Sequence, residues 1–239
     1  MRDYRPVGAV PRWIVGALGT VLAVQLALQA MRPAAAPAAT DLPPPPGAAA
    51  LRLASFGEPE AGARLAMLYL QSYDFAGTNT TPYSRLDYTR LVGWLRAILE
   101  LDPRSQYPLF SAARVYAETE DAARARLALE FVYQEFLRDP NRRWPWLAHA
   151  ALLAKHRLHD LHLARRYAQA VQQRTTAREV PLWAKQMEIF ILEDMNELEA
   201  ARIMLGGLLQ SGTVRDPAEL RFLREHLQHL EERIGASKR

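Results

Sequence analysis

The architecture of this chain is set by four proline-led segments within residues 106–239: PLFSAARVYAET (108–119), PWLAHAALLAKH (145–156), PLWAKQMEIFIL (181–192) and PAELRFLREHLQ (217–228). The prolines that open them are separated by 37, 36 and 36 residues. Each proline precedes an apolar, helix-like run, and proline suits the first helical position because its missing N–H has no intrahelical partner to lose. A near-constant period in the thirties predicts an all-α fold, an α-solenoid of stacked helix pairs.

The same spacing predicts where the helices lie. We expect helix pairs at 107–118 and 121–138, 145–157 and 161–174, and 181–194 and 197–210, with a closing helix at 217–233. Asp121, Asp160 and Asn196 fall at the turns inside the three pairs. Because Asp and Asn are favoured helix N-caps, the residue chemistry agrees with the spacing.

Two further helices are expected upstream, at about 58–73 and 86–101. The second should end before Pro103, because the residue that precedes a proline is disfavoured in the helical conformation. The loop between them, FAGTNTTPYS (75–84), is longer than the other connections. Long loops often carry function, although a tolerated insertion is the simpler explanation of this one.

Positions counted from each proline predict the core. Large residues stand one and two places after the first three prolines: Leu109 and Phe110, Trp146 and Leu147, Leu182 and Trp183. Five places after the same prolines stand Ala113, Ala150 and Gln186. A large residue followed one turn later by a small one is typical of a helix that packs closely on its partner. We therefore expect these aromatic residues and alanines to lie in the core.

The repeat resembles the tetratricopeptide (TPR-like) family. The ending ILELDP (98–103) is similar to the close of that repeat, and Ala113, Tyr116, Ala128 and Pro140 match its small residue, aromatic, alanine and proline once three extra residues are allowed. The period of 36–37 departs from the family's 34, the third unit has glutamine at the small position, and the last unit has one helix. The 36-residue Sel1-like repeat is a close alternative. Both resemblances imply a curved right-handed stack whose concave side binds a peptide or a protein surface.

The N-terminal residues predict a membrane anchor. Residues 1–12 are polar and basic, whereas 13–31 (WIVGALGTVLAVQLALQAM) are 19 residues without a charge. As a helix this run would be roughly 28 Å long, close to the thickness of the hydrocarbon core of a bilayer. Because Arg2, Arg5 and Arg12 precede it, the positive-inside rule places the N-terminus in the cytoplasm. We expect a single-pass bacterial inner-membrane protein with a periplasmic C-terminal domain.

A cleaved signal peptide is the alternative, with Ala36-Pro37-Ala38 offering a cleavage site before Ala39. Residues 32–50, six of which are proline, predict a Pro/Ala-rich disordered linker. As an extended stalk, this linker would reach up to ~60 Å from the bilayer. Residues 51–239 are then the TPR-like α-solenoid domain.

Composition argues against most catalytic classes. The chain has no cysteine, which excludes a thiolate metal site and a cysteine nucleophile. Its net charge of +4 is too mild for a nucleic-acid-binding face. No GxSxG, no GxGxxG and no phosphate-binding glycine loop occurs. We expect no catalytic residue, no cofactor, no bound metal, no nucleic-acid partner and no small-molecule substrate.

One histidine cluster offers an alternative chemistry. His156, His159 and His162 lie within seven residues, and three imidazoles can hold a metal ion. Because Asp160 begins a new helix, the three side chains need not share a face, and partly exposed histidines at a turn are the simpler explanation. A metal-dependent enzyme that uses this cluster is therefore kept as an alternative function.

The candidate binding groove uses polar positions on the first helix of each pair: Arg114, His149, Lys185 and Glu188. These residues stand four to seven places after the opening prolines. The predicted function is a membrane-anchored scaffold or chaperone that binds a protein partner in the bacterial envelope. A dedicated accessory subunit of one inner-membrane complex is the main alternative.

Overall fold

The computed structural model describes residues 11–31, 42–73 and 86–237. These residues form α-helices and one 3-10 turn, without a strand in the described ranges. The chain divides into two units, of which the first contains α1 (Arg12–Met31) and the second contains the described residues from 42 onward. The predicted all-α class is confirmed.

In the first unit, α1 carries its apolar side chains exposed, including Leu18 at 65% and Leu26 at 61%. Within the part of the chain that the structure describes, no helix combines the length and the apolar character needed to cross a membrane. The membrane span at residues 13–31 therefore stays a prediction.

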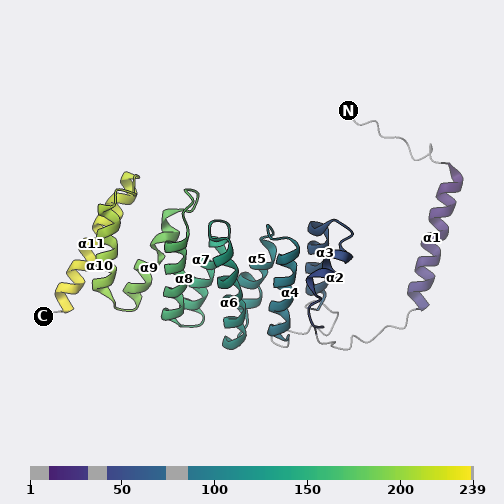
Figure 1. Cartoon of the computed structure of the whole chain (residues 1–239), viewed down its shortest axis with the longest axis horizontal. Helices are drawn as coiled ribbons and strands as arrows, with labels where there is room; N and C mark the ends of the chain where they lie inside the picture. Colours follow the sequence, from purple (N-terminus) through teal and green to yellow (C-terminus); the bar gives the residue numbers. More distant parts are fainter. Residues whose placement is uncertain (1–10, 32–41, 74–85, 238–239) are drawn as a thin grey trace. The chain divides into compact units, whose positions relative to one another are not determined.

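The second unit contains ten helices and the 3-10 turn, which follow one another along the chain (Figure 1): α2 (Ala48–Ala54), α3 (Pro59–Ser72), α4 (Tyr88–Leu101), α5 (Tyr107–Arg114), the 3-10 turn (Tyr116–Glu118), α6 (Ala122–Arg138), α7 (Pro140–His156), α8 (Leu161–Arg174), α9 (Leu182–Asp194), α10 (Leu198–Gln210) and α11 (Pro217–Ser237). Each predicted helix from residue 107 onward is present. Most begin and end within one or two residues of the prediction, but α5 ends four residues early, before the 3-10 turn, α7 begins five residues early and α11 ends four residues late. The loop at 75–84 and the cleavage site at Ala36-Pro37-Ala38 lie outside the described residues.

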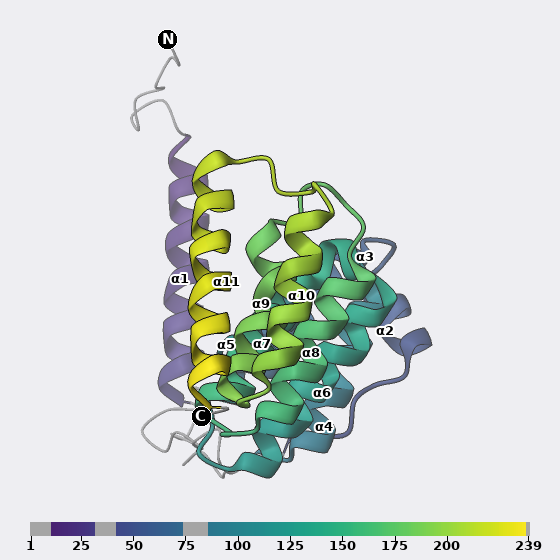
Figure 2. The ribbon, with the colours of Figure 1, turned by 90° about the vertical axis from the view of Figure 1, so that its left-hand side faces the viewer.

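The helices of the second unit pack in two layers. α5, α7 and α9 form one layer, and α6, α8 and α10 form the other (Figure 2). Each helix packs on its neighbours in sequence, and α5 also packs on α7 and α7 on α9. We call α5, α7 and α9 the first helices, because each leads one of the predicted pairs.

The small residues of the repeat lie in the core, as predicted. Ala113 and Ala150 are completely buried, and so are Ala128, Ala164 and Ala168 on the second helices. The third unit replaces the small residue by Gln186, which is 5% exposed. Its Nε2 donates a hydrogen bond to Oε1 of Glu219 on α11 at 3.2 Å. This hydrogen bond satisfies the buried amide of Gln186 and connects α9 to α11, the last helix.

Two of the three predicted N-caps are confirmed. A carboxylate oxygen of Asp121 accepts hydrogen bonds from the amides of residues 123 and 124, and one of Asp160 accepts from Leu163 N at 2.9 Å. Asn196 is not an N-cap. It has a φ of +60°, a conformation that asparagine tolerates better than most residues, and Glu197 stands between it and α10. Asn196 therefore reverses the chain between two helices.

The expected start of α7 at Pro145 is wrong. The helix begins at Pro140, which occupies the first helical position, so Pro145 lies inside it. Pro145 removes the hydrogen bond that the carbonyl of Asn141 would otherwise accept. The side chain of Asn141 connects α7 to the segment that follows α8. Its Oδ1 accepts hydrogen bonds from the backbone N–H groups of Thr176 and Ala177 at 2.8 and 2.9 Å.

The disordered linker predicted for residues 32–50 is wrong for residues 42–50. Leu42 is only 1% exposed, and α2 begins at Ala48. The indole N–H of Trp94 on α4 donates to the carbonyl oxygen of Pro43 at 2.8 Å, and a guanidinium N–H of Arg90 donates to that of Leu42 at 2.7 Å. An aromatic surface with an N–H donor is a usual way to hold a polyproline segment. The proline run is thus docked on α4.

We predict that an extra methyl group on α4 disturbs this docking. A Cβ at Gly93 would lie 2.8 Å from Cγ of Pro45, whereas a Cβ at Gly206 on α10 would have no neighbour within 4 Å. Gly206→Ala should raise the free energy of unfolding by ~0.5–1 kcal/mol through helix propensity. In Gly93→Ala, overpacking of about 1–3 kcal/mol offsets that gain. Urea unfolding should therefore give a higher free energy of unfolding for Gly206→Ala than for Gly93→Ala. Equal stabilisation of the two variants would contradict the docking of the proline run on α4.

Candidate functional site

A row of half-exposed aromatic side chains crosses the first helices. The aromatic row consists of Tyr107 and Phe110 on α5, Trp144 and Trp146 on α7, and Trp183 on α9. The ring centroids of Tyr107 and Phe110 lie 6.1 Å apart, those of Phe110 and Trp146 5.6 Å apart, and those of Trp144 and Trp183 5.6 Å apart. The contacts therefore link α5 to α7 and α7 to α9.

Hydrogen bonds hold part of the aromatic row in place. The indole N–H of Trp146 donates to Oε1 of Gln106 at 2.6 Å. Nε2 of Gln71 on α3 donates to the hydroxyl of Tyr107 at 2.7 Å, which connects the row to the preceding helix. Side chains fixed in this way lose little conformational entropy when a partner binds.

The prediction that Phe110 and Trp183 are core residues is wrong, because Phe110 is 38% exposed and Trp183 is 53% exposed. Trp146 is partly buried and packs against the core. Leu109 and Leu147, beside two of them in the sequence, are fully buried and anchor α5 and α7 instead. A helix that is covered on one side only buries one of two adjacent residues and exposes the other. The missed signal was the pairing of a leucine with an aromatic residue, which the sequence alone does not assign to faces.

The four predicted groove residues do not form one site. Arg114 is exposed at the end of α5, and its charge acts on His149 of α7. Lys185 lies at a cavity formed by the connections that precede α9 and α11. Glu188 is 2% exposed and unavailable to a partner.

Glu188 has a structural role. Its Oε1 accepts hydrogen bonds from Nε of Arg165 and from Nε2 of Gln169, both at 3.2 Å. These donors stand on α8, so the contacts connect the second helix of one pair to the first helix of the next. A buried carboxylate needs such partners, because leaving it unpaired in the interior is costly. Its position seven residues after Pro181 did not reveal on which side of α9 it lies.

His149 is a partly buried histidine whose pKa is lowered. Burial lowers its pKa below the ordinary value of 6.5, and the positive charge of Arg114 lowers it further, against a smaller opposite effect of Glu118. Its Nε2 is buried without a hydrogen-bond partner. A proton added at this atom would therefore place a charge in a poorly solvated position.

This lowered pKa predicts acid sensitivity. As the pH falls through about 6.5, the unfolded chain binds a proton at residue 149 while the folded chain does not, so the free energy of unfolding decreases. The loss is complete below the folded pKa. His149→Gln should remove this contribution, which urea unfolding at a series of pH values would measure. His156→Gln, which removes an exposed histidine of the same helix, is the control, and an unchanged pH dependence in His149→Gln would refute the assignment.

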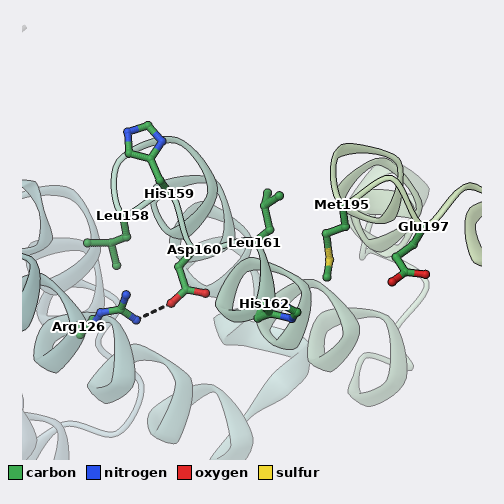
Figure 3. Close-up of a pocket in the computed structure, with 8 residues that line it drawn as sticks. All are labelled: Arg126, Leu158, His159, Asp160, Leu161, His162, Met195 and Glu197. Atoms are coloured by element: carbon green, nitrogen blue, oxygen red, sulfur yellow. Dashed lines mark hydrogen bonds and ion pairs between the residues drawn. The ribbon is translucent and has the colours of Figure 1, made fainter.

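The histidine cluster does not form a metal site. His156, His159 and His162 are all exposed, and the described residues contain no group of three or more ligands able to hold a metal ion. His159 and His162 line a cavity of about 460 Å³, yet their rings point in different directions (Figure 3). The turn between α7 and α8 points these two rings apart, because His159 has a φ of +50° and Asp160 caps α8. Asp160 also forms an ion pair with Arg126 at 2.6 Å.

The comparisons with known proteins do not assign the chain to a family. No family model matches the chain, and neither a curated protein nor a solved structure shows significant similarity to it. The fold therefore defines the class, an all-α protein whose adjacent helices pack in a manner compatible with a helical repeat.

Proposed function

We propose that this protein is a membrane-held TPR-like scaffold or chaperone that binds a protein partner along the aromatic row. The observation that carries the proposal is the exposure of Tyr107, Phe110 and Trp183, in a row of ring contacts that joins three successive first helices through Trp144 and Trp146 of α7. Aromatic residues are enriched in protein interfaces and supply much of their binding energy. A scaffold needs no catalytic group, which agrees with the absence of a catalytic motif in the sequence.

The aromatic row suits an extended segment of the partner. Packed helices lie 8–10 Å apart, and three residues of a polyproline II segment advance ~9.3 Å. Every third side chain of such a segment would then meet the next first helix. The second unit already holds one segment of this kind, because Leu42 and Pro43 are bound by donors from α4.

The membrane attachment is supported by the sequence. Residues 13–31 carry no charge, and three arginines precede them. The apolar side chains of α1 are exposed, so they are free to contact lipid or another apolar helix. We propose that this segment holds the chain at the bacterial inner membrane, with the second unit in the periplasm.

Gentle detergent extraction of the full chain with a C-terminal tag, followed by mass spectrometry, tests the proposal. One partner set at constant ratio indicates a dedicated subunit of an inner-membrane complex, and a diffuse set of exported proteins indicates a chaperone. Recovery of the chain from the soluble fraction with no protein bound would refute both the attachment and the scaffold.

A further inference from the structure

A cavity of about 750 Å³ lies at the start of α9, away from the residues of the aromatic row. Its lining comes from the connection between α8 and α9 and from the connection between α10 and α11. Three of the lining residues are basic: Arg178, Lys185 and Arg215. The volume falls within the range of small-molecule sites.

The three basic side chains have no acidic partner among the described residues. No ion pair involves Arg178, Lys185 or Arg215, and no carboxylate lines the cavity. The nearest acidic residue in sequence to Arg215 is Asp216, whose Oδ1 accepts from Ala218 N at the start of α11. The cavity thus has an excess of positive charge.

The backbone that lines the cavity is held in place by hydrogen bonds. Asn141 accepts from the N–H groups of Thr176 and Ala177, and Ser211 forms hydrogen bonds with the hydroxyl and the N–H group of Thr213. Pro181, the N-cap of α9, supplies no side-chain hydrogen bond to the first helical N–H groups. The helix dipole favours negative charge at this end of α9.

We propose that this cavity binds a phosphate group. Two guanidinium groups supply paired N–H donors that match the oxygens of a phosphate, and Lys185 adds a point charge. The ligand supplies the negative charge that the protein itself lacks there. A soluble phosphate compound and a phospholipid headgroup present the same chemistry, so the two sources are separated by experiment.

The test uses the full chain in mild detergent and compares two double variants of equal charge. Arg178→Gln/Arg215→Gln removes cations of the cavity, whereas Arg174→Gln/Arg224→Gln removes exposed cations elsewhere on α8 and α11. Inorganic phosphate, titrated at constant ionic strength and followed by NMR chemical shifts, should saturate the wild type and the control. The cavity variant should bind at least about 100-fold more weakly, because it loses two charged hydrogen-bond donors.

A second arm reconstitutes the chain in phosphatidylcholine bilayers, with and without phosphatidylglycerol, and compares the NMR chemical shifts of residues around the cavity. Loss of the phosphatidylglycerol-dependent shift changes in the cavity variant alone would assign a lipid headgroup as the ligand. Phosphate binding without this lipid effect would assign a soluble compound. If neither probe binds, or if the control variant loses as much as the cavity variant, the proposal is wrong. Circular dichroism melting should be the same for all three proteins, since the replaced side chains are exposed.

Discussion

Replacing Arg143 by alanine is expected to lower the free energy of unfolding by about 3–5 kcal/mol, the usual cost of breaking a buried ion pair from one side. Arg143 is 4% exposed and Glu135 is 1% exposed. One guanidinium nitrogen of Arg143 donates to Oε2 of Glu135 at 2.8 Å and to its backbone oxygen at 2.7 Å. The other donates to the carbonyl oxygen of Pro103 at 3.1 Å.

The expected loss is large because one side chain joins three parts of the fold. Arg143 stands on α7, Glu135 on α6, and Pro103 in the connection between α4 and α5. Without Arg143, the buried carboxylate of Glu135 keeps only Arg138, a partner whose side chain is 58% exposed. An uncompensated charge in a poorly solvated position is the main destabilising effect. Arg143→Lys should also destabilise the protein, because an ammonium group does not reach the three acceptors at once.

Urea unfolding followed by circular dichroism measures this effect. Arg142→Ala is the matched control, because its partner Asp139 lies 3.5 Å away and both side chains are well exposed. That control should lose less than about 1 kcal/mol. A loss in Arg143→Ala no larger than that of the control would show that the buried pair does not hold α6 and α7 together.

The second large effect is expected on partner binding. Phe110→Ser/Trp183→Ser should weaken binding of the partner at least about 100-fold, because truncation of a central aromatic contact often costs 2 kcal/mol or more. Both side chains are at least 38% exposed, so the free energy of unfolding should change little in comparison. The affinity of the partner recovered with the tagged chain would be measured for the wild type and for the variant.

The matched control is Leu127→Ser/Ile203→Ser. Leu127 on α6 is 47% exposed and Ile203 on α10 is 66% exposed, so the control removes as much exposed apolar character from the second helices. Its affinity for the partner should equal that of the wild type. Equal weakening in both double variants would indicate general hydrophobic adhesion rather than a site on the first helices.

The period of the prolines and the small residues of the repeat were sufficient to predict the helices of residues 107–237. Ala113 and Ala150 are buried as expected, because a close approach of two helices tolerates only small side chains at the contact. The start of α7 was missed because two prolines, Pro140 and Pro145, lie within one turn and a half. Proline spacing does not tell which of them occupies the first position.

The surface was harder to predict than the helices. Phe110 and Trp183 look like core residues in the sequence, because hydrophobicity alone does not distinguish a buried face from an exposed one. The docking of Leu42 and Pro43 on α4 was missed for a different reason. It depends on Trp94, about 50 residues later in the chain, and composition describes only the local segment. Contacts between residues far apart in the sequence also determine that Glu188 is buried and that Lys185 lines a cavity.

Site-specific photo-crosslinking tests the central claim most directly. A photoreactive residue is placed at Phe110, at Trp183 or, as a control, at Leu127 on α6, in the full-length tagged chain in cells. The account predicts crosslinks to the same partner from positions 110 and 183, on the first helices, and none from position 127. Crosslinks from position 127 alone would contradict it, because the partner would then bind the second helices.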